Sequence, residues 1–301
     1  MKYFHVFLLI FFSATAAAQG RTEQREIVVD GLNRSFVVYV PATGSTPQSL
    51  PVLISLHGRF GTGEQMLRFA DFRQLADKEN FIIVCPDGID KSWNAGLKTP
   101  ANRKGVNDVK FIDQLITYAL AKYNGDAKRV YVTGMSNGGF LASRLACELP
   151  GRIAAIAAVG ASMDKYQDYH PTKPVPVMYI QGTKDPLVPF DGGAKRSGAR
   201  GAIYSHADIL KLWIDADACA GTPVITNLPD NAGDGTSIVK EEYTNAKTGI
   251  KVVGCTVINA GHTWPGGTQY LPKMIIGSVS HNMNACEVIW EFFKGYRLAN
   301  D

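Results

Sequence analysis

Three side chains of this sequence, Ser136, Asp185 and His262, could together carry out nucleophilic acyl transfer. A serine hydroxyl is a weak nucleophile at neutral pH, so a base must take its proton as it attacks. A carboxylate behind that base holds the correct tautomer and stabilises the imidazolium that forms. The set predicts a serine hydrolase that forms an acyl-Ser136 intermediate, with no metal ion and no organic cofactor.

Ser136 lies in a glycine-bracketed turn, Gly134-Met-Ser-Asn-Gly138. A β-branched run over 129–133 precedes the turn, and an apolar, helix-like segment over 140–145 follows it. Glycines two residues before and after the serine remove side chains that would clash at a sharp strand-to-helix turn. The pattern occurs once in the sequence and predicts a nucleophile elbow. The alternative is a serine that only caps the following helix.

Asp185 and His262 each follow a strand-like run. Asp185 comes after the run over 175–181, in a turn fixed by Pro186, where it could also be a simple turn former. Asp191 is the competing acid. His262 lies in a glycine-framed loop after a strand. Of the competing histidines, His57 is already needed for the loop in which it lies, and His170, His206 and His281 lack a glycine-framed position after a strand. The order serine, acid, histidine along the chain is that of α/β-hydrolases and not of chymotrypsin or subtilisin.

The tetrahedral intermediate also needs two hydrogen-bond donors for its oxyanion. One should be the backbone N–H of Asn137, directly after the nucleophile. We expect the other to come from the loop after His57-Gly58, either from the N–H of Arg59 or from that of Phe60. His57 itself would hold this loop through hydrogen bonds, or would be an ordinary core histidine.

Strand-like and helix-like segments alternate along the chain after an antiparallel hairpin over 27–40. Such alternation predicts an α/β fold with a mostly parallel sheet, helices on both faces, and ligands at the carboxyl ends of the strands. The expected later strands are 52–56, 81–85, 129–133, 153–159, 175–181, 238–243 and 250–258, and the expected helices are 64–80, 109–123, 140–145, 207–213 and 286–296. We expect one catalytic domain over residues 19–301.

Residues 1–18 have the pattern of a secretory signal peptide: a short basic start, an apolar core over 7–12 and a small-residue cleavage site ending at Ala18. The apolar core is too short to cross a bilayer, although an uncleaved anchor is the alternative. The sequence therefore predicts export to a periplasm or the medium, and no membrane segment after cleavage. Its net charge of +4 is dispersed, which argues against nucleic-acid binding.

The chain has five cysteines, and an exported protein can retain disulfides. Cys219 and Cys255 are the preferred pair, since a bridge between them would fix the segment that leads to His262. Cys85, Cys147 and Cys286 lie in strand-like or helix-like patterns where packed free thiols are common. The sequence alone does not determine the pairing.

With these residues in hand, the chain resembles the polyhydroxybutyrate depolymerase and feruloyl esterase group of secreted α/β-hydrolases, which includes acetylxylan esterase relatives. The resemblance runs from about Phe36 to Phe293. The motifs that carry it are Leu56-His-Gly58, Pro86-Asp-Gly88, Ser92-Trp-Asn-Ala-Gly96, Asn107-Asp-Val109, Gly134-Met-Ser-Asn-Gly-Gly139, Asp185-Pro186 and Gly261-His-Thr-Trp-Pro-Gly-Gly267.

The resemblance implies that Ser136, Asp185 and His262 are the triad and that Trp264 borders the acyl or monomer pocket. Trp93 and Trp264 would suit a flat hydroxycinnamate by stacking, or they could be core tryptophans. Arg59-Phe60 stands where relatives often carry small residues, so the identity of the second oxyanion donor is open and Phe60 is a candidate substrate contact.

The leading functional hypothesis is a secreted serine carboxylesterase that releases hydroxycinnamate or acetyl groups from plant polysaccharide, most specifically a feruloyl esterase. The alternative is a depolymerase of short-chain polyhydroxyalkanoate. Two hypotheses come from other functional classes. One is a peptidase like the prolyl oligopeptidase catalytic domain, and the other is a carbohydrate-binding relative without catalysis. The expected partner is a small or polysaccharide-linked ester, and the oligomeric state is left open.

Overall fold

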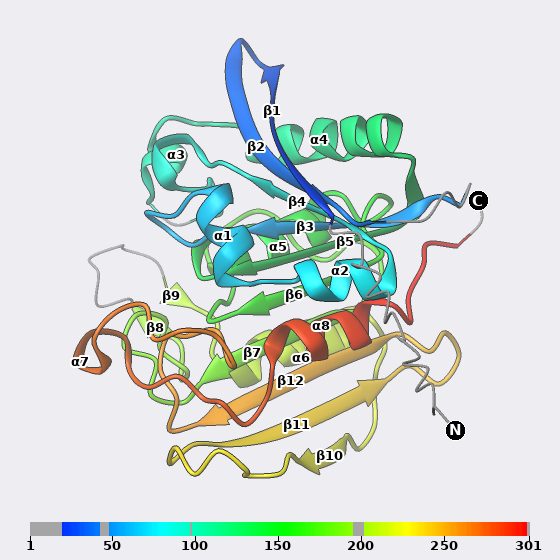
Figure 1. Cartoon of the computed structure of the whole chain (residues 1–301). Coiled ribbons are helices and arrows are strands. Elements are labelled where there is room, and N and C mark those ends of the chain that lie inside the picture. Colours follow the sequence, from blue (N-terminus) through cyan, green and yellow to red (C-terminus); the bar gives the residue numbers. More distant parts are fainter. Residues whose placement is uncertain (1–19, 43–47, 97, 195–201, 300–301) are drawn as a thin grey trace, which may run out of the picture.

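The computed structural model describes residues 20–42, 48–96, 98–194 and 202–299. The predicted signal peptide lies outside these ranges. The main sheet has ten strands in the order β1-β2-β4-β3-β5-β6-β7-β12-β11-β10 (Figure 1). Its strands are β1 (Arg21–Val29), β2 (Leu32–Val40), β3 (Leu50–Leu56), β4 (Ile82–Pro86), β5 (Gly125–Met135), β6 (Ala155–Val159), β7 (Val177–Gly182), β10 (Val224–Asn227), β11 (Ser237–Thr244) and β12 (Lys251–Ile258).

The centre of the sheet is parallel and both edges are antiparallel. Parallel pairs link β4, β3, β5, β6, β7 and β12 in turn. The β1–β2 hairpin adds to β4 at one edge, and β11 and β10 add to β12 at the other. The carboxyl ends of the six parallel strands therefore meet along one edge of the sheet, as the alternating pattern predicts.

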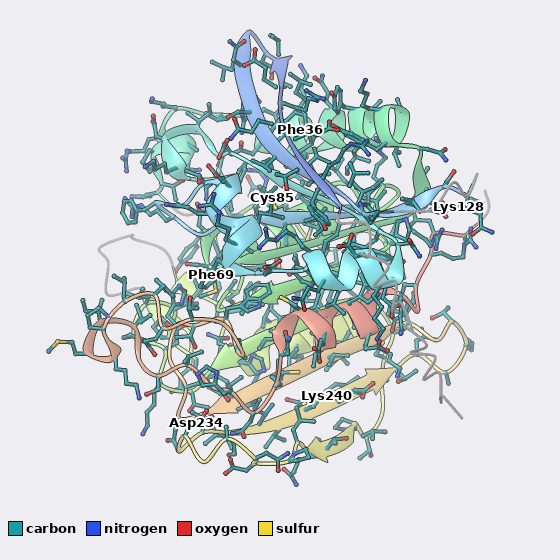
Figure 2. The ribbon with its side chains drawn as sticks, viewed as in Figure 1. Phe36, Phe69, Cys85, Lys128, Asp234 and Lys240 are labelled. Carbon is teal, nitrogen blue, oxygen red and sulfur yellow. The ribbon has the colours of Figure 1, made fainter. Side chains whose placement is uncertain are left out.

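Helices cover both faces of the sheet (Figure 1). One face packs against α4 (Asp108–Tyr123), α5 (Asn137–Glu148) and α6 (His206–Ala216), and the other packs against α1 (Gly63–Phe69), α2 (Arg73–Glu79) and α8 (Ala285–Phe293). Side chains fill the space between the helices and the sheet, which separates the apolar core into two layers (Figure 2). The short elements are η1 (Ile89–Lys91), α3 (Pro100–Arg103), α7 (Lys273–Ile276), β8 (Gly193–Ala194) and β9 (Ala202–Ile203).

The expected helix over 64–80 is two helices in the structure. The chain turns at Ala70 and Phe72, between α1 and α2. Both residues are buried, so the break lets the apolar side chains of two short helices reach the same core layer. Six elements, η1, α3, α7, β8, β9 and β10, fall in segments without a clear apolar period, so the sequence did not predict them.

The predicted disulfide between Cys219 and Cys255 is wrong. All five cysteines are buried, free thiols. Cys219 belongs to the core layer that contains α6, whereas Cys255, in β12, belongs to the layer that contains α8. The two thiols therefore lie on opposite faces of the sheet, a difference that alternation along β12 decides and that sequence position cannot show.

Among the described helices, none has the length and apolar character needed to cross a membrane.

Candidate active site

Ser136 occupies the sharp turn between β5 and α5, with φ 53° and ψ −120°. Its backbone N–H donates to the carbonyl of Val159, which ties the turn to the neighbouring strand β6 (2.9 Å). The bracketing glycines are sterically required, because a Cβ at Gly134 would lie 2.5 Å from the carbonyl carbon of Gly138, and one at Gly138 would lie 2.3 Å from the Leu56 oxygen. The local geometry is that of the predicted elbow.

Asp185 and His262 come together although 77 residues separate them. His262 Nδ1 lies 2.7 Å from Asp185 Oδ2, and both side chains are almost fully buried. The other carboxylate oxygen, Oδ1, accepts the backbone N–H groups of Leu187 and Val188, each at 2.8 Å. These bonds fix the carboxylate so that one oxygen faces the imidazole.

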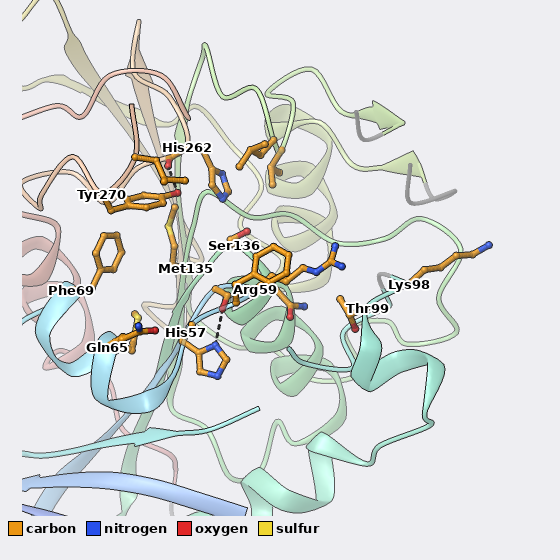
Figure 3. A pocket seen from close by; sticks show the side chains of 18 residues that line it. His57, Arg59, Gln65, Phe69, Lys98, Thr99, Met135, Ser136, His262 and Tyr270 are labelled. Atoms are coloured by element: carbon orange, nitrogen blue, oxygen red, sulfur yellow. Dashed lines mark hydrogen bonds between the residues drawn. The ribbon is translucent and has the colours of Figure 1, made fainter. Parts of the chain in front are cut away.

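Ser136 and His262 line the same cavity, which has a volume of about 570 Å³ (Figure 3). Its wall is mostly apolar and includes Met66, Phe69, Met135, Leu187, Val188, Tyr270 and Leu271. A cavity of this size and character fits a small organic ligand with a few polar groups that set its orientation. Asp191 and the histidines His170, His206 and His281 are absent from the described lining.

The loop after β3 passes close to Ser136, and its residues Gly58, Arg59 and Phe60 line the same cavity. A Cβ at Gly58 would lie 3.5 Å from Ser136 Cβ, so the loop passes in van der Waals contact with the elbow. The N–H of Phe60 already donates to the carbonyl of Lys91 (2.8 Å). Within the described residues the N–H of Arg59 has no such partner, and the N–H of Asn137 lies at the first position of α5, where helical N–H groups are free. Of the two alternatives, Arg59 is therefore the available donor.

His57 holds this loop, as one reading of the sequence proposed. Its Nδ1 lies 2.7 Å from the carbonyl oxygen of Gly58, and its Nε2 accepts the N–H of Gly88 (3.0 Å). An imidazole that donates through one nitrogen and accepts through the other is neutral. Burial lowers the pKa of His57, which favours the same neutral form.

The expectation that Trp93 and Trp264 stack on a substrate is not met by this geometry. Trp93 is fully buried, and its Nε1 donates to the carbonyl of His57 (2.8 Å). Trp264 is 1% exposed and packs edge-on against Phe69 and Phe72, with ring centroids 6.2 and 6.3 Å away. Neither tryptophan lines the cavity. They support the wall from behind, which the alternative of core tryptophans anticipated.

The aromatic side chains that do line the cavity are Phe60, Phe69 and Tyr270. Phe60 is a predicted contact, is 71% exposed and adopts a positive φ of 73°. Phe69 and Tyr270 meet edge to face, with ring centroids 5.4 Å apart. Neither was predicted from the sequence. Phe69 was predicted only as part of the apolar face of a helix, and no local pattern indicates a role for Tyr270.

Sheet order, helices on both faces and the strand–serine–helix turn place the chain among the α/β-hydrolases. Two solved structures share this fold. The match with an acetyl xylan esterase from Aspergillus awamori covers 80% of this chain and 94% of that protein, with a TM-score of 0.54 and 15% identity. A thermostable esterase covers 66% of this chain and 52% of its own, with a TM-score of 0.50 and 18% identity.

A family model described as "Esterase PHB depolymerase" matches residues 34–209, which is more than half of the chain. The chain belongs to this family. The match includes the elbow and Asp185 and ends before His262.

Several curated relatives of this chain carry the names of esterases. "Putative esterase NocK" of Nocardia uniformis subsp. tsuyamanensis is 29% identical over 92% of this chain and 84% of its own. Feruloyl esterase B of Piromyces equi is 28% identical over 76% of this chain but only 42% of its own length. Acetylxylan esterase A of Emericella nidulans is 26% identical over 52% of this chain and 54% of its own. Family and relatives together support hydrolysis of carboxylic esters.

Proposed function

We propose that this protein is a serine carboxylesterase in which Ser136, His262 and Asp185 form the catalytic triad. The observation that carries the proposal is the elbow serine sharing one cavity with a histidine that is hydrogen-bonded to a buried carboxylate. With Nδ1–H of His262 donating a hydrogen bond to Asp185, Nε2 keeps its lone pair for the serine proton. The three residues then have the roles of nucleophile, base and orienting acid.

In this mechanism Ser136 Oγ attacks the ester carbonyl carbon while His262 Nε2 takes the hydroxyl proton. The N–H groups of Asn137 and Arg59 stabilise the oxyanion that forms. The intermediate collapses as the imidazolium gives its proton to the leaving alcohol, which leaves an acyl-Ser136. Water, activated by the same histidine, then releases the acid and restores the serine.

For the substrate we propose aromatic or acetyl esters of plant polysaccharide, with a hydroxycinnamate ester as the leading candidate. The printed names of two relatives, a feruloyl esterase and an acetylxylan esterase, support this class. The cavity supports it as well, since Phe69 and Tyr270 offer aromatic surface inside an apolar wall. We also propose that the protein is exported with removal of residues 1–18, and that residues 19–301 act as one catalytic domain.

Polyester hydrolysis is the second candidate, and the family description favours it. Turnover of methyl ferulate, acetylated xylan and 3-hydroxybutyrate oligomers separates the two, with Ser136→Ala as the control. Higher kcat/KM on methyl ferulate supports the leading candidate. Activity on the oligomers alone would overturn it in favour of the polyester.

The esterase assignment has its own test. A proline-containing peptide anilide cleaved without turnover of any ester would replace it with a peptidase. Labelling by an organophosphate reports the nucleophile directly: we expect labelling of the wild-type chain and none of Ser136→Ala.

A further inference from the structure

The cavity around Ser136 has a one-sided distribution of charge. Its described lining includes two cationic side chains, Arg59 and Lys98, and contains no aspartate or glutamate. Most other polar lining groups are neutral or belong to the proposed catalytic machinery. A purely apolar ester would gain nothing from two cations at this position.

The two kinds of lining residue lie on different sides of the serine. In Figure 3, Phe69 and Tyr270 lie on one side of Ser136, and Thr99 and Lys98 lie on the other. The guanidinium of Arg59 lies between Ser136 and Lys98 in this view. An ester bound with its carbonyl carbon at Ser136 would place one half against the aromatic rings and the other half toward the cations.

The backbone that carries Lys98 is tied to the elbow. Asn137 Oδ1 accepts the N–H of Trp93 (2.7 Å), and Asn137 Nδ2 donates to the carbonyl of the same tryptophan (3.2 Å). That carbonyl also accepts the buried hydroxyl of Thr99 (2.8 Å), and the carbonyl of Lys98 accepts Arg103 Nη1 (2.8 Å). The backbone next to Lys98 is therefore linked, through Thr99 and Trp93, to the residue that follows the nucleophile.

Arg59 is held by its own loop. The preceding residue, Gly58, lies close to Ser136, and the backbone N–H of the following residue, Phe60, donates to the carbonyl of Lys91. The guanidinium of Arg59 lies over the Phe60 ring, 4.8 Å from the centroid. A planar cation stacked on an aromatic ring keeps its N–H groups free for an anion.

Neither cation is neutralised by an acid within the part of the chain that the structure describes. Nearby cations have such partners: Lys104 pairs with Asp90, and Arg144 pairs with Glu148. Arg59 and Lys98 form no ion pair with any described residue. Both side chains are exposed, so water solvates them in the free protein and no acid of the chain competes with a ligand for them. A guanidinium suits a carboxylate, because it can donate two parallel hydrogen bonds to it.

We propose that the side of the cavity formed by Arg59, Lys98 and Thr99 binds a carboxylate carried by the substrate. The preferred substrates are then esters with an anionic group on the half that points away from Phe69 and Tyr270. This inference rests on the proposed esterase function and narrows its substrate class to esters that carry a free carboxylate in addition to the ester that is cleaved, such as aromatic or acetyl esters of a polysaccharide that contains uronic acid.

The test uses two pairs of esters that differ only in charge. In 4-acetoxybenzoate and 4-acetoxybenzamide the group that varies is on the alcohol half, and in methyl 4-carboxybenzoate and methyl 4-carbamoylbenzoate it is on the acyl half. The ratio of kcat/KM within each pair, divided by the ratio of alkaline hydrolysis rates, reports charge preference alone. We expect at least one corrected ratio of about ten in favour of the carboxylate at low ionic strength, falling as salt screens the charges.

Arg59→Gln and Lys98→Gln should each lower that corrected ratio by about three- to tenfold, as expected for one partly exposed charge. The matched control is Lys122→Gln, which removes an exposed lysine in the last turn of α4, away from the cavity lining, and should leave the ratio unchanged. Thermal unfolding of each variant checks that the fold is intact, and the two variants are independent of each other.

Corrected ratios at or below one for both pairs would overturn the proposal, as would ratios that survive both substitutions. The esterase function would stand in either case, because turnover of the neutral carboxamides reports it separately. If the wild-type protein hydrolyses none of the four esters but turns over methyl ferulate, the carboxylate site fails and the esterase function stands. If it hydrolyses no ester at all, both proposals fail.

Discussion

The residues proposed for the chemistry and the residues that shape the cavity come from different kinds of structure. Ser136, Asp185 and His262 each follow the carboxyl end of a parallel strand, namely β5, β7 and β12. Most of the cavity wall comes instead from α1, from the loop after β3, from the segment before α3 and from the loop after His262, whereas Met135, Leu187 and Val188 belong to the strand ends that carry Ser136 and Asp185. Strand ends are fixed by the hydrogen bonds of the sheet, whereas loops depend on side-chain contacts particular to this chain.

In this protein the residues proposed for the reaction are therefore largely separate from those that select the substrate. Changes at the strand ends should abolish turnover of every ester, whereas changes in the loops should alter which esters are accepted. The loop after His262 belongs partly to both groups, since Tyr270 lines the cavity and also donates its hydroxyl to the carbonyl of His262 (2.9 Å).

Ser136→Ala should have the largest effect. Removal of the nucleophile is expected to lower kcat by about 10⁴- to 10⁶-fold on all esters, as in other triad enzymes. Burst kinetics with a chromogenic acetate would confirm the loss of the acyl-enzyme. A residual rate within tenfold of wild type would show that Ser136 is not the nucleophile.

Asp185→Asn comes next, with an expected loss of about 10²- to 10⁴-fold in kcat. The amide can donate a hydrogen bond to His262 Nδ1 and so favours the tautomer in which Nε2 carries the proton. The effect should be on kcat with KM nearly unchanged. Asp191→Asn is the matched control and should behave as wild type, because Asp191 does not line the cavity.

Tyr270→Phe tests the position shared by both groups. The ring and its contact with Phe69 are retained, and only the hydrogen bond to the His262 carbonyl is lost. Loss of one such bond, at about 1 kcal/mol, should lower kcat by about fivefold on all substrates, with little change in KM. An equal effect in KM alone would make Tyr270 a cavity wall only.

Phe69→Ala should change selectivity more than chemistry. The substitution removes an aromatic face from the cavity, so KM for methyl ferulate should rise by about tenfold, or about 1.4 kcal/mol. KM for a methyl or ethyl acetate should change less than threefold. Equal effects on aromatic and acetyl esters would contradict the role of Phe69 as an aromatic contact for the substrate.

Asp217 is a second buried carboxylate, and it has fewer hydrogen-bond partners than Asp185. Asp185 accepts two N–H groups and faces His262, whereas Asp217 accepts the N–H of Val175 through one oxygen and leaves the other without a described partner. Burial raises the pKa of Asp217 to about 7. The folded state therefore binds a proton more tightly than the unfolded state, and this contribution to stability is lost as the pH rises from about 4 to about 7.

Asp217→Asn should remove that pH dependence without changing activity. Above pH 7 the variant should be more stable than wild type, by roughly 1–3 kcal/mol in the free energy of unfolding. Urea unfolding of both proteins at pH 5 and pH 8 measures the difference. A variant that is less stable at pH 8 would show that the charged carboxylate is satisfied in the folded protein.

Much of the fold could be predicted because its signals are local. The apolar strands, the helix over 109–123 and the turn around Ser136 appear in the structure at or near their predicted positions. The break between α1 and α2 could not be predicted, since a continuous apolar stripe fits one helix as well as two. The predicted pairing of Cys219 with Cys255 was wrong for a related reason. The sequence does not show which face of the sheet each cysteine lies on, and the two lie on opposite faces.

The sequence by itself determined the order of the three candidate catalytic residues and the steric need for glycine around Ser136, since both follow from residue type and spacing. Only the tertiary structure decided what surrounds them. In the folded protein Trp93 and Trp264 are buried, and Phe69 and Tyr270 line the cavity. The N–H of Phe60 donates to Lys91, which leaves the N–H of Arg59 as the available oxyanion donor. Those outcomes depend on packing between segments far apart in the chain, which no local pattern records.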